Sequence, residues 1–222
     1  MMSVLSHRFR GRRMGTFGLS LLLGASAFAS LGFPRAGATT LMRQSLSDLA
    51  KGSEVIFEGQ AVSRAVEPLP DGQGARTCVN FRIIEMIAGS RPGSTMRLCF
   101  LGGMLNGQGF GVSGMNYPAV GEHGVYLVES TGQPLVNPLI GWDQGHFLVA
   151  KDPATGTLKM TTADRRRIVG LAAEAAKPTA GSGEIVSPDA TAAGVMSDGN
   201  SSLAGAMSRD EFITRLRSFR EH

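Results

Sequence analysis

The sequence of 222 residues is poor in the residue types that mark several functional classes. It contains two cysteines, one tryptophan and two tyrosines. The cysteines, Cys78 and Cys99, lack the paired spacing of a zinc site. The arginine run 165–167 has no interleaved aromatic residue to stack on nucleic-acid bases. No lysine lies between Lys51 and Lys151, which argues against a phosphate-binding loop in that interval.

The segment 102–117, GGMLNGQGFGVSGMNY, is rich in glycine and needs a separate explanation. A dinucleotide-binding loop follows a strand and opens a helix. Here Pro118 and another apolar, strand-like run follow instead. We therefore expect Gly102, Gly103 and Gly107 to serve turns with positive φ values, and we expect no nucleotide or other cofactor.

Acidic residues are absent before Thr39, whereas five of the 22 basic residues precede it. The remainder has 18 acidic residues and a net charge of −1, so the excess of basic residues that would suit nucleic acid is confined to the first segment. Basic residues, an apolar run and the small residues of 36–38 predict a signal peptide over 1–38. Earlier cleavage near 25–29 and an uncleaved anchor are alternatives, and Arg12-Arg13 leaves the twin-arginine route open. We expect an exported protein with no integral membrane span after cleavage.

Hydrophobic periodicity predicts a mainly β fold. Ser45 and Asp48 have capping-box spacing before a short helix. Strand patterns follow near 54–62, 76–87, 95–100, 123–130, 146–150 and 157–160. Cys78 and Cys99 share the polar parity of two neighbouring strands, and in an exported protein this predicts a disulfide between them. Reduced core thiols or metal ligands are the alternatives.

These patterns predict one domain, a small antiparallel OB-like β-barrel over 39–160. The region 161–206 is expected to be partly helical and then, because it is rich in Ala, Gly, Ser and Thr, a disordered linker. A C-terminal amphipathic helix is predicted over 207–222, since Ser208 and Glu211 form a second capping-box pattern ahead of an apolar stripe.

Candidate catalytic and metal-binding residues are few. Ser113 misses the G-x-S-x-G pattern of a nucleophile by one residue. A cysteine could pair with His123 or His146 for nucleophilic catalysis, but exported cysteines are more often structural. The same histidines with Met104 and Met115 could hold copper, although methionine also fills core gaps. None of these patterns is strong enough to assign catalytic, metal or cofactor-binding residues.

The order of motifs is the last source of evidence. The segments PAVGEHGVYLVE (118–129) and IGWDQGHFLVAKDPATG (140–156) resemble a group of exported bacterial proteins of unknown function, with a GE turn and a QGxF segment. The first part is also similar to the OB-fold of netrin-like domains and tissue inhibitors of metalloproteinases. Those inhibitors bind zinc through an N-terminal cysteine, which a chain starting at Thr39 lacks, so no functional residue is transferred.

The resulting expectation is a noncatalytic exported binding module for a protein or another envelope component. A periplasmic hydrolase with an unrecognised site near the glycine-rich segment is the alternative, and a metal-handling periplasmic protein is the third hypothesis. Whether the chain is an enzyme stays open, and the sequence favours a noncatalytic function.

Overall fold

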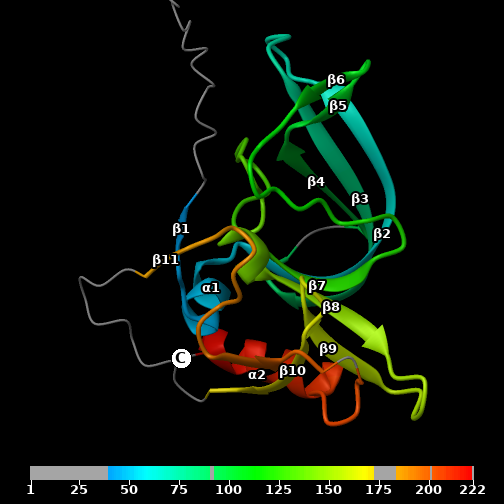
Figure 1. Ribbon diagram of the computed structural model, residues 1–222, viewed down its shortest axis with the longest axis vertical. Coiled ribbons are helices and arrows are strands. Elements are labelled where there is room, and N and C mark those ends of the chain that lie inside the picture. Colours follow the sequence, from blue (N-terminus) through cyan, green and yellow to red (C-terminus); the bar gives the residue numbers. More distant parts are fainter. Residues whose placement is uncertain (1–39, 91–92, 173–183, 201, 222) are drawn as a thin grey trace, which may run out of the picture. The chain divides into compact units, whose positions relative to one another are not determined.

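A computed structural model of the chain describes residues 40–90, 93–172, 184–200 and 202–221 (Figure 1). The predicted signal segment 1–38 lies outside the described residues. Within the described ranges, no helix has both the length and the apolar character needed to span a membrane.

The main element is a sheet of eight strands whose neighbours are all antiparallel. The order across the sheet is β12-β10-β9-β8-β7-β2-β3-β4. The strands are β2 (Val55–Pro68), β3 (Ala75–Ala88), β4 (Thr95–Leu101), β7 (His123–Val128), β8 (His146–Lys151), β9 (Leu158–Thr162), β10 (Arg167–Leu171) and β12 (Val195–Asp198). The mainly β prediction is confirmed. Since β4 and β12 are separate edges, the described sheet is not closed, and the OB-like barrel is not confirmed.

The described residues also form two small sheets and three helical segments. One sheet pairs β1 (Leu41–Met42) with β11 (Ile185–Val186), and the other pairs β5 (Gly103–Leu105) with β6 (Gln108–Phe110). The helices are α1 (Leu46–Gly52), the 3-10 helix η1 (Trp142–Gly145) and α2 (Arg209–Glu221). Both predicted caps are present: the Ser45 hydroxyl accepts a bond from the Asp48 amide, and the Ser208 hydroxyl accepts one from Glu211.

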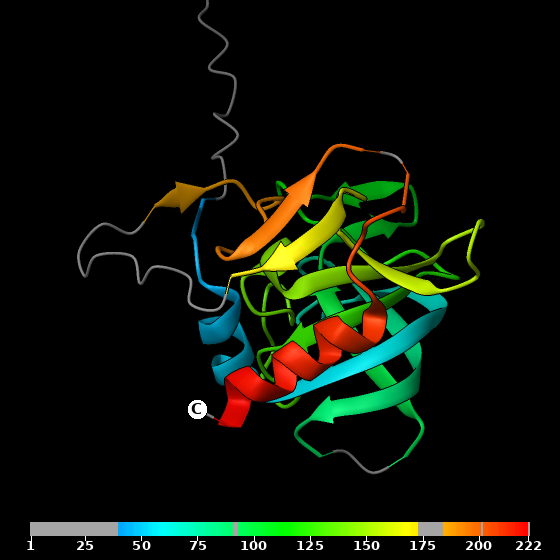
Figure 2. The ribbon, with the colours of Figure 1, turned by 90° about the horizontal axis from the view of Figure 1, so that it is seen from below.

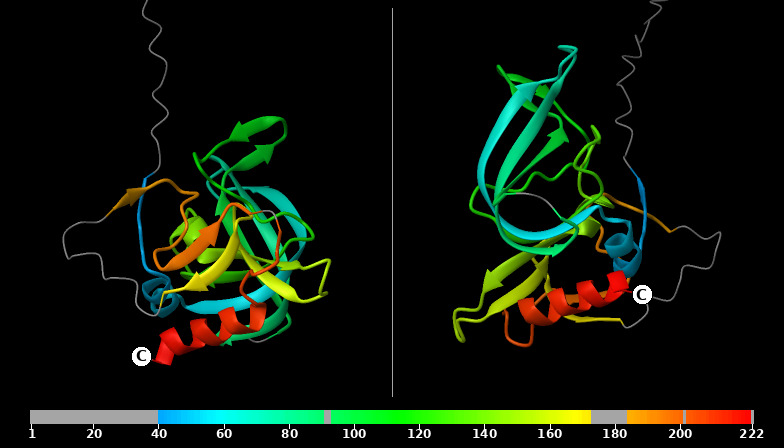
Figure 3. Two further views of the ribbon diagram at one scale, coloured as in Figure 1. Left: turned by 60° about the horizontal axis from the view of Figure 1, so that its bottom comes forward. Right: turned by 180° about the vertical axis from the view of Figure 1, so that it is seen from behind.

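The apolar side chains form two clusters, one on each face of β2 and β7. The helix-side core lies between this sheet and helices α1 and α2, and includes Ile56, Val125, Leu127, Phe147 and Phe212. Figure 2 shows α2, in red, running alongside the main sheet, and Figure 3 shows it from two further sides. The aromatic core contains Phe57, Phe81, Phe100, Tyr126 and their neighbours. Because successive side chains of a strand point to opposite faces, a strand buried on both faces is a nearly continuous apolar run, which in β2 only the buried Glu58 interrupts before Gly59.

The predicted disulfide is confirmed. Cys78 on β3 and Cys99 on β4 are direct cross-strand partners, with an S–S distance of 2.05 Å. As the parity predicted, they lie on the face opposite Val79 and Leu98, which belong to the aromatic core.

The predicted linker over 161–206 is wrong for part of its length. Strands β10 and β12 lie within it and extend the main sheet, and no helix is present in its described residues. The physical reason is that β12 pairs with β10 through backbone hydrogen bonds, which need few large side chains. Residues 173–183 and 201 lie outside the described residues.

The glycine-rich segment has the predicted positive φ values, 94° at Gly102, 140° at Gly103 and 80° at Gly107. The sequence did not indicate that β5 and β6 would pair there as a hairpin, turning at Asn106 and Gly107. The hairpin is followed by a loop that returns to β7, so the segment is a connection between strands.

Candidate functional site

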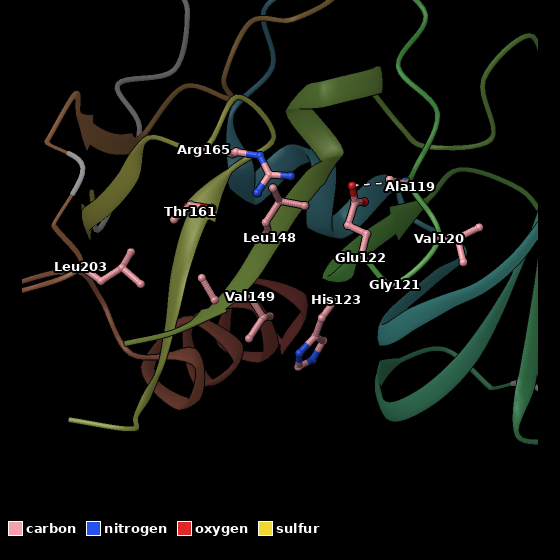
Figure 4. Close-up of a pocket in the computed structure, with 11 residues that line it drawn as sticks. Ala119, Val120, Gly121, Glu122, His123, Leu148, Val149, Thr161, Arg165 and Leu203 are labelled. Carbon is pink, nitrogen blue, oxygen red and sulfur yellow. Dashed lines mark hydrogen bonds between the residues drawn. The ribbon is translucent and has the colours of Figure 1, made fainter. Parts of the chain in front are cut away.

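A groove of about 560 Å³ lies beside strands β8 and β9 (Figure 4). It is bordered by the segment 119–123, by 148–150 on β8, and by Thr161, Arg165 and Leu203. Phe147 on β8 points into the helix-side core, so its neighbour Leu148 faces the other side of the sheet, toward the groove. The wall of the groove at β8 is therefore apolar. The charged or titratable groups of the groove are Glu122 and His123 in the segment 119–123 and Arg165 after β9.

The segment 119–123 contains the GE turn predicted from the sequence. The Gly121 amide donates to the Ala61 carbonyl at 2.8 Å, and the Glu122 amide donates to the Ala119 carbonyl at 2.9 Å. Gly121 has a φ of 91°, a value that favours glycine. The turn places Glu122 and His123 one after the other at the start of β7.

Glu122 is engaged by two buried partners. Its Oε1 lies 2.8 Å from Nε2 of His146 and accepts a bond from the Tyr126 hydroxyl at 3.1 Å. Burial raises the pKa of Glu122, but the interaction with His146 and the hydrogen bonds from the Ala119 amide and the Tyr126 hydroxyl together lower it by more, so the net pKa is below its usual value. The phenol of Tyr126 has a raised pKa because it is buried beside this carboxylate.

His146 has one ring nitrogen that lacks a partner among the described residues. Nδ1 is buried and has no hydrogen bond there. The ring also stacks on Tyr126 with centroids 5.1 Å apart. This packing orients the imidazole but leaves its side chain only 5% exposed.

His123 belongs to a second carboxylate–histidine pair. Its Nε2 lies 2.8 Å from Oε1 of Glu58, a side chain on β2 that is 1% exposed. Arg209 at the start of α2 donates from Nε to the other Glu58 oxygen at 3.0 Å, and also binds Glu85 on β3. Burial raises the pKa of Glu58, but bonds from His123 and Arg209 lower it by more, giving a net decrease. Both pairs are therefore held inside ion networks of the fold.

Arg165 is the charged residue of the groove whose side chain has no partner within the described part of the chain. It occupies the turn between β9 and β10 with a φ of 65°, and its amide donates to the Thr162 carbonyl at 2.9 Å. No hydrogen bond or ion pair joins its guanidinium to another described residue. By contrast, Arg167 binds Asp198 at 2.6 Å and Arg166 binds the Ser197 carbonyl at 3.3 Å. The three arginines are in a turn and a strand, so the helical part expected for 161–206 does not occur at these residues.

The other residues considered in the sequence do not gather into a site. Ser113 is exposed in the loop after β6. Both cysteines are in the disulfide, which removes the proposed thiol–imidazole pair. Met104 is 64% exposed on β5, whereas Met115 packs against the aromatic core. Among the described residues, no group of three or more His, Cys, Asp or Glu side chains is arranged to hold a metal ion.

Sequence reasoning missed Glu58, Glu122 and Arg209. Glu58 had a detectable signal, because it is the one charge inside the buried run 55–59 and a buried charge needs a partner. Arg209 had none, since 151 residues separate it from Glu58.

Searches of protein-family models, of curated proteins and of solved structures found no match to this chain.

Proposed function

We propose that the chain is an exported, noncatalytic binding module that holds a protein or envelope-surface ligand in the groove beside β8. The ligand offers an anionic group, such as a carboxylate, to Arg165. An apolar part of the ligand lies against Leu148 and Leu203.

The observation that supports this proposal is the contrast between engaged and free charges. Glu122 and His123 already bind partners within the chain, whereas the Arg165 guanidinium is unpaired in the described residues. A guanidinium is well suited to a carboxylate, which it can bind with two parallel hydrogen bonds. Its φ of 65° is uncommon for a residue with a side chain and is typical of positions used in binding.

A hydrolase is the second candidate, and one observation favours it. Two carboxylate–histidine pairs, Glu58 with His123 and Glu122 with His146, border or adjoin the groove. Such pairing orients an imidazole for general-base catalysis. Among the described residues, the groove lining contains no serine or cysteine, and the Thr161 hydroxyl forms no hydrogen bond with either histidine. Binding therefore accounts for the groove with fewer assumptions.

The test measures thermal stability with short apolar peptides that end in a free carboxylate, and with the same peptides as C-terminal amides. A ligand that binds only the folded state stabilises it by about 2.7 kcal/mol at a hundredfold excess over Kd. We expect the free acids to raise the Tm, the amides to act weakly, and Arg165→Gln to abolish the response.

Arg166→Gln is the matched control and should respond like the unaltered protein. A response retained in Arg165→Gln, or none with any peptide, would contradict the groove assignment. Cleavage of the peptides, detected by mass spectrometry, would favour the hydrolase over the binding module.

A further inference from the structure

Strand β4 has a free hydrogen-bonding edge. The Gly102 amide donates inward to the Ala75 carbonyl at 2.7 Å, and the Leu101 amide donates to Val136 on the opposite side at 2.8 Å. Because backbone groups alternate sides along an antiparallel strand, the N–H and C=O of residues 95, 97 and 99 face away from β3. Within the described ranges, no backbone group pairs with them.

This edge is rigid. Met96, Leu98 and Phe100 are at most 2% exposed in the aromatic core. The disulfide fixes Cys99 directly opposite Cys78 on β3. An added strand would therefore lose little freedom of β4, and preorganisation of this kind favours binding. The pairing of Leu101 with Val136 already continues the ladder at one end.

The outer face beside this edge has more positive than negative groups. Arg76 and Arg97 both bind the single carboxylate of Glu67. Arg82 lies two residues beyond Asn80, the cross-strand partner of Arg97, and donates to the neutral side-chain amide oxygen of Gln60 at 2.7 Å. Arg97 remains 45% exposed. The face can accept further carboxylates from a partner.

A second copy of the chain fits this edge poorly. Leu101 already pairs with Val136, so the unpaired stretch 95–99 is centred on Arg97, and two copies paired antiparallel over that stretch would place the two arginines opposite each other. Like charges directly opposite destabilise a strand pair, and a charge on an edge is a known protection against self-association.

We propose that the β4 edge binds an extended acidic segment of another protein, which adds as a strand and alternates acidic with apolar side chains. The acidic side chains lie beside Arg97, and the apolar ones extend the aromatic core next to Leu98. Strand addition gives affinity through main-chain bonds and specificity through alternate side chains. This surface is separate from the groove.

The probe is an acetylated peptide of alternating glutamate and valine, and its control alternates lysine and valine. Amide hydrogen exchange is followed by NMR on the full chain. In the free protein, the amides of Thr95, Arg97 and Cys99 should exchange fast while that of Leu98 is protected. The acidic peptide should slow the three edge amides, and the basic peptide should not.

Three variants of Arg97 separate the contributions. Arg97→Pro removes an outward N–H that β3 does not use, so binding should fall at least about tenfold through lost main-chain bonds. Arg97→Ala retains the N–H and should weaken binding about two- to fivefold. Arg97→Glu should reverse the preference between the two peptides. It keeps the test informative if the proline variant does not fold.

The proposal would be overturned if the acidic peptide still slowed exchange of the Thr95 and Cys99 amides in Arg97→Pro. Equal binding of the two peptides, or no effect of the acidic peptide on the edge amides of the unaltered protein, would also overturn it. Concentration-dependent protection without peptide would assign the edge to a second copy instead. Arg165→Gln should leave this binding unchanged, so the groove and the edge can fail independently.

Discussion

Replacing Arg209 by methionine tests whether α2 is held by the buried carboxylate of Glu58. Methionine retains much of the apolar length of arginine and removes the guanidinium. Glu58 is 1% exposed and Arg209 is 19% exposed. The variant therefore leaves a carboxylate in the interior with only His123 as its remaining partner.

The expected cost is about 3 kcal/mol in the free energy of unfolding. Removing one member of a buried pair costs about 3–5 kcal/mol, and His123 keeps the value at the lower end. For a domain of this size, the Tm should fall by about 6–12 °C. The control is Arg217→Met, which breaks an ion pair with Glu85. The side chains of Arg217 and Glu85 are 44% and 29% exposed, so the loss of this pair should cost at most about 1 kcal/mol.

The loss should also depend on pH. The folded-state pKa of Glu58 is below its ordinary value of 4.5, so its stabilising contribution is complete above that pH and is lost as pH falls through the lowered pKa. Without Arg209, burial raises the pKa of Glu58, and its carboxyl takes up a proton at higher pH. The stabilities of the variant and the original protein should therefore converge below pH 4.5.

Urea unfolding, followed by the fluorescence of the single tryptophan Trp142 and by far-UV circular dichroism, measures both effects. The reasoning is refuted if Arg209→Met and Arg217→Met cost the same at neutral pH. It is also refuted if the cost of Arg209→Met does not decrease in acid.

Three further predictions concern other parts of the fold. Replacing Cys78 and Cys99 by serine should lower the free energy of unfolding by about 3 kcal/mol, because the bridge closes a loop of 21 residues; unchanged urea midpoints would disprove this. Gly107→Ala should cost about 1–2 kcal/mol for its positive φ. Gly102→Ala should cost more, since its Cβ would lie 2.5 Å from a backbone oxygen, and equal Tm losses would contradict the geometry. Asp143→Asn should stabilise the protein at neutral pH, because burial raises the folded pKa of this carboxyl; the gain should shrink as pH falls, and a loss at neutral pH would argue against it.

The parts of the fold that were predicted are those with a strong local signal. Strands β3 and β4 have one buried face, so Val79 and Leu98 alternate with polar residues and also set the parity of the two cysteines. The helix caps are equally local, because each joins residues three positions apart.

The parts that were missed depend on distant partners. Strand β12 has few large side chains and is fixed by its ladder to β10, which its own composition does not indicate. The network of Glu58 and Arg209 joins opposite ends of the chain. The candidate groove likewise combines segments from 119 to 203, so the Arg165 guanidinium, which has no partner among the described residues, could be recognised only in three dimensions.

The division of the interior into two cores has a consequence for the order of folding during synthesis. All buried members of the aromatic core lie between Val55 and Leu139, whereas the helix-side core requires Phe212, Ile213 and Leu216. A growing chain can thus assemble the first core, and bring its cysteines together, before the second has its covering helix. Until those last residues emerge, the apolar backs of β2 and β7 stay open to water, and such a nascent intermediate is prone to aggregate unless a chaperone covers it.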